Sequence, residues 1–366
     1  MSQGRDQRFM DLALSLGRRG LGNVWPNPAV GCVIVQGERV VGRGWTQPGG
    51  RPHAEAMALA QAGDAAQGAD VYVTLEPCSH TGKTPPCADA LVNAGVSRVI
   101  AALGDPDERV AGRGFEKLRQ SGIEVSIGVG AEAAALDQRG FLSRTTRGLP
   151  MLTLKIATSL DGRIATASGE SQWITGARAR REAHALRARH DAVLVGAGTA
   201  REDNPTLTVR DLGVQQQPVR VVASRYLNVP MPSRLSESTD QAPYWILHGP
   251  TAPTERREKA RAHGADLIEI ASSDGGGLDP AAMLAALADR GVTRVFCEGG
   301  GELSAALLNA GLVDDLVVFQ AGLALGAEGR PALGAMGIAA LAEANRMTLI
   351  QTRSLCPDTM SVWRKP

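Results

Sequence analysis

Short apolar runs alternate with helix-forming stretches along almost the whole chain, and this alternation stops and restarts once. An amphipathic stretch at 6–18 comes first, and strand-like runs such as AVGCVIV follow it. The pattern breaks near RTTRGLPM (144–151) and then begins again. Strands that alternate with helices predict layered α/β sheets rather than a helix bundle. Because 366 residues exceed one ordinary core, the restart predicts two domains, 1–147 and 148–366.

Apolar periodicity places the expected elements in both halves. In the first half, strands are expected at 29–35, 39–45, 70–75 and 97–103, helices at 6–18, 53–61 and 86–93, and a helix, a strand and a helix over 114–138. In the second half, strands are expected at 152–157, 191–195, 219–223, 244–248, 292–297 and 315–320, and helices at 177–189 and 303–309. Residues 224–290 are less decisive, because Pro, Ser and Gly cluster there.

The charge and cysteine content exclude several classes of protein. Lys and Arg number 39 against 38 Asp and Glu, and aromatic residues make up only 4% of the chain. A nucleic-acid partner is not expected, since such proteins usually carry a basic surface with aromatic stacking platforms. No apolar run approaches the ~20 residues of a membrane span, and no signal peptide is recognised at the N-terminus. Five cysteines, an odd number, do not suggest a disulfide framework, so a cytoplasmic protein with reduced thiols is expected.

Four residues of the first half have the order and spacing of a catalytic zinc site. His53 and Glu55 lie two apart at the expected start of a helix, and Cys78 and Cys87 each stand on or just before the next helix. One imidazole and two thiolates supply three of the four ligands that Zn²⁺ prefers, which leaves one position for water. Zinc lowers the pKa of that water to about 7, and Glu55 is placed to move protons rather than to bind metal. This pattern is typical of zinc-dependent base deaminases.

Each of these residues has a simpler explanation when it is taken alone. A single loop histidine is usually structural, a helical glutamate usually faces solvent, and two cysteines can form a disulfide or fill a core. All four residues in this order, directly after the strand-ending TLEPC (74–78), favour the zinc site.

The eight residues between the two cysteines make the pattern more specific. Together with PNPAVG (26–31) and VAGRG (110–114), this wide spacing resembles the bifunctional deaminase/reductase family of riboflavin biosynthesis. The resemblance implies a cytidine-deaminase-like three-layer α/β/α domain that binds a phosphoribosylated pyrimidine. It also implies substrate contacts from Asn27, His80 and Lys83, although the last two could equally lie in an exposed turn. The family often has a histidine where this chain has Thr46.

Four motifs of the second half resemble the reductase half of the same family. They are LKIATSLDGRIA (154–165), SGESQWIT (168–175), VGAGTAREDNPTLTVR (195–210) and CEGGGELSAALL (297–308). The resemblance implies a dihydrofolate-reductase-like α/β domain that uses NADPH. The implied cofactor contacts are Ala157, Asp161, Thr199, Asp203, Gly299, Gly300 and Gly301, with Asp161 equally explicable as a turn residue. The implied substrate contacts are Lys155, Ser171, Trp173, Arg187, Leu207, Arg210 and Glu298, of which Lys155 and Glu298 are also expected to be catalytic.

Two of these expectations have a physical basis in the residue types themselves. Arg187 and Arg210 suit a phosphate, since a guanidinium can hold two oxygens at once. The glycine triplet follows a strand and opens a helix, where backbone N–H groups can approach a phosphate, although a tight turn is the plainer explanation. Ser224 stands where the family often has an aspartate near the cofactor.

The function that the resemblance implies for the whole chain is a two-step enzyme. Its zinc domain would deaminate a diaminopyrimidinone ribosylamine 5′-phosphate, and its second domain would reduce the ribosyl group to a ribityl chain with NADPH. A homo-oligomer that acts on this small molecule, with no nucleic acid and no membrane as partner, is expected. Two alternatives remain open from the residues alone: a deaminase of nucleic-acid bases, and a structural zinc module joined to a nucleotide-sensing domain.

Overall fold

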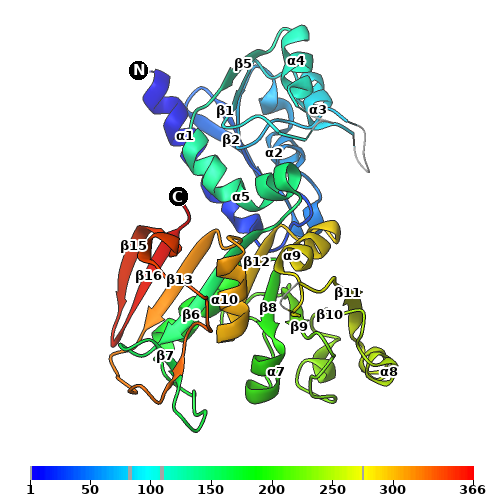
Figure 1. The fold of residues 1–366 in the computed structure, drawn as a ribbon. Helices are drawn as coiled ribbons and strands as arrows, with labels where there is room; N and C mark the ends of the chain where they lie inside the picture. The colour runs from blue at the N-terminus through cyan, green and yellow to red at the C-terminus, as the bar shows by residue number, and fades with distance from the viewer. Residues whose placement is uncertain (1, 81–84, 108–110, 274–275) are drawn as a thin grey trace. The chain divides into compact units, whose positions relative to one another are not determined.

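The computed structural model describes residues 2–80, 85–107, 111–273 and 276–366 (Figure 1). The chain divides into two compact units, Met1–Gly148 and Leu149–Pro366, and each has its own sheet. The division falls one residue after the boundary expected from the sequence. Among the residues described, no helix combines the length and the apolar character needed to span a membrane.

The first unit is built on a five-stranded mixed sheet in the order β2-β1-β3-β4-β5. β2 and β3 run antiparallel to β1, whereas β3, β4 and β5 are parallel to one another. The strands are β1 (Gly31–Gln36), β2 (Arg39–Trp45), β3 (Asp70–Val73), β4 (Arg98–Ala101) and β5 (Glu124–Ile127). The helices are α1 (Ser2–Gly17), α2 (Ala54–Ala62), α3 (Cys87–Asn93), α4 (Arg113–Gln120) and α5 (Ala131–Arg147).

Alternation along the strands produces two separate cores, one on each face of this sheet. Cys32 and Ile34 of β1 point into a cluster that contains buried residues of α2, α3 and α4. Val33 and Val35 point the other way, into a cluster formed with α1 and α5. Successive strand residues face opposite sides of a sheet, so an apolar run such as GCVIV supplies both cores. The first unit is therefore a three-layer α/β/α domain, as predicted.

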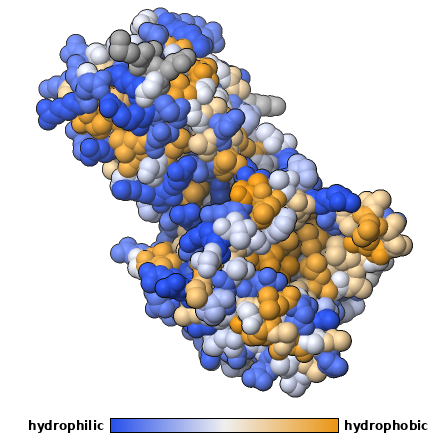
Figure 2. Space-filling model, turned by 90° about the vertical axis from the view of Figure 1, so that its left-hand side faces the viewer, coloured by the Kyte–Doolittle hydropathy of each residue, from blue (hydrophilic) through white to orange (hydrophobic). Residues whose placement is uncertain are grey.

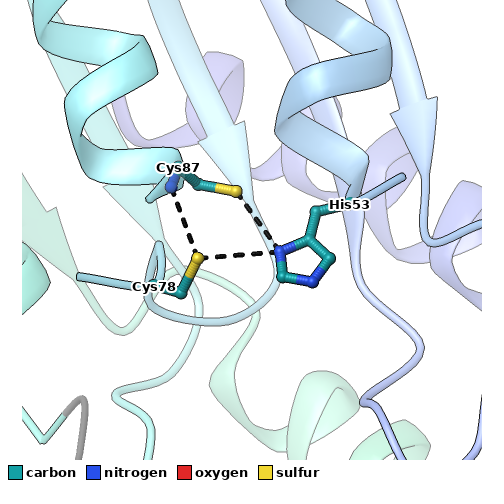
Figure 3. Close-up of side chains that lie close together, drawn as sticks. All are labelled: His53, Cys78 and Cys87. Atoms are coloured by element: carbon teal, nitrogen blue, oxygen red, sulfur yellow. Dashed lines mark hydrogen bonds between the residues drawn. The ribbon is translucent and has the colours of Figure 1, made fainter. Parts of the chain in front are cut away.

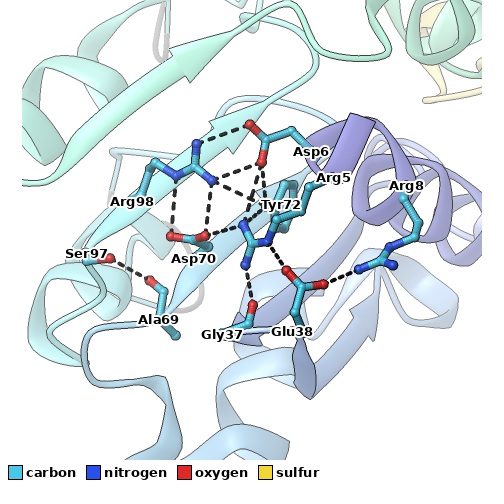
Figure 4. Close-up of polar contacts among 10 residues, drawn as sticks. All are labelled: Arg5, Asp6, Arg8, Gly37, Glu38, Ala69, Asp70, Tyr72, Ser97 and Arg98. Atoms are coloured by element: carbon cyan, nitrogen blue, oxygen red, sulfur yellow. Dashed lines mark hydrogen bonds and ion pairs between the residues drawn. The ribbon is translucent and has the colours of Figure 1, made fainter. Parts of the chain in front are cut away.

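A partly buried ionic network fixes α1 to the sheet (Figure 4). Arg98 donates to Asp6 at 2.9 Å and to Asp70 at 3.1 Å, and Arg5 donates to Asp70 at 2.8 Å. The Tyr72 hydroxyl donates to Asp6 at 2.7 Å. Asp70 and Arg98 begin β3 and β4, so the network lies at the amino ends of these strands, away from the residues that follow their carboxyl ends.

The second unit has a nine-stranded sheet in the order β11-β10-β9-β8-β12-β6-β13-β16-β15. In this spatial order, all the strands from β11 at one edge through to β13 run parallel to one another. β16 and β15 then pair antiparallel at the other edge. The strands of the unit are β6 (Met151–Thr158), β7 (Arg163–Ala165), β8 (Ala192–Gly196), β9 (Val219–Ala223), β10 (Tyr244–His248), β11 (Asp266–Glu269), β12 (Arg294–Gly299), β13 (Asp315–Gln320), β14 (Arg330–Pro331), β15 (Thr348–Leu355) and β16 (Asp358–Arg364). The helices are α6 (Ala177–Arg187), α7 (Ala197–Asp203), α8 (Thr254–Ala262), α9 (Pro280–Asp289) and α10 (Gly301–Asn309).

The parallel order determines where a site can form in this unit. Ligand sites of parallel α/β sheets lie beyond the carboxyl ends of the strands. β6, β8 and β12 are neighbours in the middle of the sheet, and β12 ends at Gly299 next to the start of α10. The residues of these strands that are predicted to act in the reductase therefore lie toward the carboxyl ends of neighbouring strands.

A candidate metal centre and a second polar cluster

Three side chains of the first unit meet at the predicted metal site (Figure 3). The ligand atoms of His53, Cys78 and Cys87 all lie within 4.8 Å of one another. His53 Nδ1 is 3.6 Å from Cys78 Sγ and 3.4 Å from Cys87 Sγ, so this ring nitrogen faces both sulfurs. The three residues form the only such group of possible metal ligands in the part of the chain that is described.

Local structure brings the two cysteines together across the loop that separates them. Cys87 is the first residue of α3, and Pro86 precedes it as the N-cap. The Cys87 N–H donates to Cys78 Sγ at 3.3 Å, and the Ala88 N–H donates to the Cys78 carbonyl at 3.1 Å. A helix N-terminus has unpaired N–H groups and a partial positive charge, which favour a thiolate.

The donor set fits zinc. Hydrogen bonds from Cys87 and His53 lower the pKa of the Cys78 thiol to about 4, while the bond to Cys78 raises the pKa of Cys87. The pair therefore holds one negative charge readily, and a divalent cation favours the second deprotonation. One imidazole nitrogen and two sulfurs are ligands that zinc accepts.

Glu55 lies beside this group in the first turn of α2. Its side chain is 4% exposed, and its carboxyl is in hydrogen-bonding contact with the Cys87 thiol. Burial, and secondarily the nearby Cys78 sulfur, raise the pKa of Glu55 to about 7. A carboxyl group with such a pKa can both give and accept a proton near neutral pH.

The other residues of the first unit that the sequence singles out differ in their surroundings. Asn27 Nδ2 donates to the Gly50 carbonyl at 2.9 Å, which holds the loop that precedes His53. His80 follows Cys78 closely and is half-buried, whereas Lys83 lies outside the described residues. Thr46 is 2% exposed; its hydroxyl donates to the Pro28 carbonyl and accepts from the Val30 N–H. Thr46 thus fixes the PNPAV segment.

A second polar cluster lies at the carboxyl edge of the second sheet. Arg187, the last residue of α6, holds both carboxylate oxygens of Glu298 and donates to the Thr208 carbonyl at 2.8 Å. Lys155 Nζ of β6 is 3.9 Å from Glu298 Oε2. Burial alone would raise the pKa of Glu298, but Arg187 and Lys155 outweigh it and keep this pKa below its usual value. Burial lowers the pKa of Lys155.

These contacts change the interpretation of Arg187. It was expected to bind a phosphate, yet its guanidinium already pairs with Glu298 and Thr208. Thr208 was not singled out from the sequence, because a backbone carbonyl leaves no trace in residue type. His184 was also missed: it accepts the Arg210 N–H at 3.2 Å, and burial followed by the charge of Arg187 lowers its pKa to about 4.

The predicted cofactor residues gather around the end of β12. The Thr199 hydroxyl of α7 donates to the Gly299 carbonyl at 3.2 Å. Gly299 and Gly300 have φ values of 84° and 101°, which favour glycine. Gly301 opens α10. Asp203 ends α7 and is hydrogen-bonded to Ser171.

The remaining predicted residues are less closely tied to this cluster. Asp161 accepts the N–H groups of Leu325 and Gly326, so it joins the turn after β6 to a segment far along the chain. The Leu207 side chain is 3% exposed in the apolar core of the unit, so only its backbone is left to face a ligand. Trp173 is 64% exposed with Arg180 stacked at 4.6 Å, Arg210 is exposed, and Ala157 is half-buried in β6.

Two protein families match the chain, one in each unit. The cytidine and deoxycytidylate deaminase zinc-binding region matches residues 3–103, and the RibD C-terminal domain matches residues 150–361. The chain thus combines a zinc-binding deaminase domain with a reductase domain of dihydrofolate-reductase-like fold, which confirms the predicted fold class.

Full-length relatives narrow this class to one family. The riboflavin biosynthesis protein RibD of Escherichia coli is 40% identical, with 97% of this chain and 98% of the relative aligned. The RibD structure of Acinetobacter baumannii (form 2) has a TM-score of 0.90 at 37% identity and covers all of both chains. A deaminase/reductase structure of Thermotoga maritima has a TM-score of 0.87 at 32% identity, again over both whole chains. The chain belongs to the RibD family of bifunctional riboflavin biosynthesis enzymes, and both alternatives left open by the residues are set aside.

Proposed function

We propose that the first unit deaminates 2,5-diamino-6-ribosylamino-4(3H)-pyrimidinone 5′-phosphate. The second unit then reduces the product with NADPH to 5-amino-6-(5-phosphoribitylamino)uracil. The T. maritima relative is described as a diaminohydroxyphosphoribosylaminopyrimidine deaminase and 5-amino-6-(5-phosphoribosylamino)uracil reductase. The observation that carries the proposal is the meeting of His53, Cys78 and Cys87 beside the buried Glu55.

In the deaminase unit, His53, Cys78 and Cys87 hold zinc, and Glu55 carries protons. Zinc in such a site activates a water molecule by lowering its pKa to about 7. Glu55 takes one proton at its carboxylate and delivers it to a ring nitrogen, then takes a second proton and delivers it to the departing amine; the water that adds to the ring supplies both protons. Asn27, His80 and Lys83 contact the substrate.

In the reductase unit, Lys155 and Glu298 act at the ribose carbon that receives the hydride of NADPH. Arg187 keeps Glu298 ionised and in place, which gives Lys155 a fixed partner. The N–H groups at Gly299, Gly300 and Gly301 approach a cofactor phosphate at the start of α10, with Thr199, Asp203, Ala157 and Asp161 around the cofactor. Ser171, Trp173, Leu207 and Arg210 are assigned to the substrate.

Replacement of Glu55 with Gln tests the deaminase proposal. Ammonia release from the diaminopyrimidine substrate should fall by roughly 10²- to 10⁴-fold, the usual contribution of a general acid–base. Zinc content, measured by metal analysis, should stay at the native level. Native ammonia release by a zinc-loaded E55Q variant would show that the proton carrier is another group.

We also propose that the enzyme is a cytoplasmic homo-oligomer. All five cysteines are free, which suits a reducing compartment. The edge strand β15 exposes Leu349 and Ile350 by nearly half, and hydrophobic side chains are visible on this side of the second unit (Figure 2). An open edge strand with apolar side chains is a surface that a second copy of the chain can cover. Light scattering should give at least twice the chain mass, and Leu349→Lys should reduce it; a monomeric native protein would contradict the proposal.

A further inference from the structure

The carboxylate of Glu76 is buried, yet the proposed chemistry does not use it. Glu76 lies two residues before Cys78, after the end of β3, and is 4% exposed. Its Oε2 accepts the N–H groups of Asp105 and Gly112 at 3.2 and 3.0 Å. Its Oε1 accepts those of Gly114 and Phe115 at 2.9 and 3.3 Å.

Three of these bonds, from Gly112, Gly114 and Phe115, hold the start of α4 against the Glu76–Cys78 segment, and the fourth ties Asp105 to the same carboxylate. The N-cap of α4 is Gly112, which has no side chain to satisfy the first N–H groups of the helix. Glu76 supplies the missing acceptor from another part of the chain, and its negative charge suits the helix N-terminus. Gly112 and Gly114 belong to the VAGRG motif (110–114), and their backbone N–H groups are bound by the Glu76 carboxylate.

A second contact joins the same two segments. A Cβ atom placed on Gly114 would lie 2.1 Å from the Pro77 carbonyl oxygen, so the backbone of α4 is in direct contact with the residue between Glu76 and Cys78. Pro77 has a fixed φ, which limits how far Cys78 can turn relative to Glu76. On its other side, Cys78 is held by the N–H groups of Cys87 and Ala88.

We propose that Glu76 is a positioning residue of the deaminase site: through α4 it fixes the Glu76–Pro77–Cys78 turn, so that the Cys78 sulfur is in its metal-binding place before zinc enters. The inference rests on the zinc site described above. Groups that orient metal ligands typically change metal affinity by 10- to 100-fold when they are removed. Because Glu76 acts through the backbone, an effect of about tenfold is expected.

The test compares Glu76→Gln with the matched control Glu116→Gln in the full-length protein. An amide has one acceptor oxygen, so in E76Q its NH₂ group faces two N–H donors. Glu116 is exposed in the first turn of the same helix. Competition with graded chelators should show about tenfold weaker zinc binding for E76Q and native binding for E116Q. Ammonia release by E76Q should fall at limiting zinc and recover at excess zinc, while NADPH oxidation stays native.

Zinc binding by E76Q within twofold of the native protein would overturn the inference, as would a loss of ammonia release that excess zinc does not restore. If the first unit of E76Q does not fold, Gly114→Ala takes its place, since it keeps the carboxylate but displaces Pro77. G114A should also bind zinc more weakly, and native affinity there overturns the inference. A native protein that binds zinc but releases no ammonia would instead contradict the proposed function.

Discussion

Glu298 stands between two cations, Arg187 and Lys155, and this arrangement determines its charge. A buried carboxylate is stable in its ionised form only when such partners are present. Arg187 satisfies both carboxylate oxygens, so Glu298 remains an anion of fixed orientation beside the lysine.

Replacement of Arg187 with Lys should slow NADPH oxidation by roughly 10- to 100-fold. Lysine keeps the charge but cannot hold both oxygens of Glu298 and the Thr208 carbonyl at once. The estimate corresponds to the loss of one hydrogen bond to a charged group, about 1.5–3 kcal/mol. Ammonia release should be unaffected, and Arg189→Lys, at an exposed position near the end of the same helix, serves as the control. An unchanged rate of NADPH oxidation by R187K would show that Glu298 does not need the two hydrogen bonds from Arg187.

Because the His190 side chain is buried, we expect the stability of the second unit to depend on pH. Its Nδ1 donates to the Leu186 carbonyl at 2.7 Å, its Nε2 lies 2.9 Å from the Thr153 hydroxyl, and burial lowers its pKa to about 3. Between about pH 6.5 and 3, the unfolded chain binds a proton that the folded chain does not, so stability falls as the pH falls. The full slope for one proton is about 1.4 kcal/mol per pH unit.

Denaturant unfolding at several pH values between 5 and 7.5 checks this expectation. His190→Gln should lower stability at pH 7.5 but flatten the pH dependence by nearly one proton. If the free energy of unfolding changed with pH equally in the native protein and in H190Q, the proton would be taken up by another group.

At this scale, the sequence identifies residues that form a short motif but not those that the fold pairs. His53, Glu55, Cys78 and Cys87 are recognisable because their spacing is short and their chemistry specific. The partners Arg187 and Glu298 lie 111 residues apart, so their contact depends on the neighbouring positions of β6, β8 and β12. Glu76 escaped notice because its partners are backbone N–H groups, which any residue supplies.

Among the elements, α2 is the one that carries most of the deaminase chemistry. His53 is its N-cap and Glu55 lies in its first turn. The helix rests on β2 at a glycine: a Cβ atom on Gly44 would lie 2.0 Å from the Ala54 carbonyl oxygen. The position of the catalytic helix therefore depends on a strand residue that has no side chain.

Replacement of Gly44 with Ala should displace α2 and impair the deaminase. Overpacking of this kind costs about 1–3 kcal/mol of stability. Ammonia release should fall at least tenfold while NADPH oxidation is retained. Gly4→Ala is the control, because a Cβ atom there meets nothing within 4 Å. Native ammonia release by G44A would show that the helix can move without loss of function.

Elements with one buried face were predictable, and those without one were not. β2, β9 and β10 match their expected bounds, and β9 and β10 were recognisable because each is a short run of buried, largely apolar residues. β15 has seven exposed residues in a row, from Thr348 to Ser354, so no alternation marks it as a strand. α8 is rich in charged residues and buries only Ala260, so no apolar periodicity marks it as a helix.

In the whole molecule, each of the two units has its own sheet and its own apolar clusters. Units of this kind usually fold around their own cores. The zinc ligands and Glu55 all belong to the first unit, and Lys155, Arg187 and Glu298 all belong to the second.

Removal of zinc should therefore separate the two reactions. Treatment with a chelator should abolish ammonia release, while the chain should still oxidise NADPH when it is given the deaminated pyrimidine. Added zinc should restore ammonia release. If both activities fell together in folded protein, the assignment of two separate sites would be wrong.

The backbone bonds between the two cysteines have a consequence for the segment that separates them. The backbone N–H groups of Cys87 and Ala88 donate directly to Cys78, so these hydrogen bonds hold the two metal ligands side by side. A change in the length of the intervening segment therefore need not separate the two ligands.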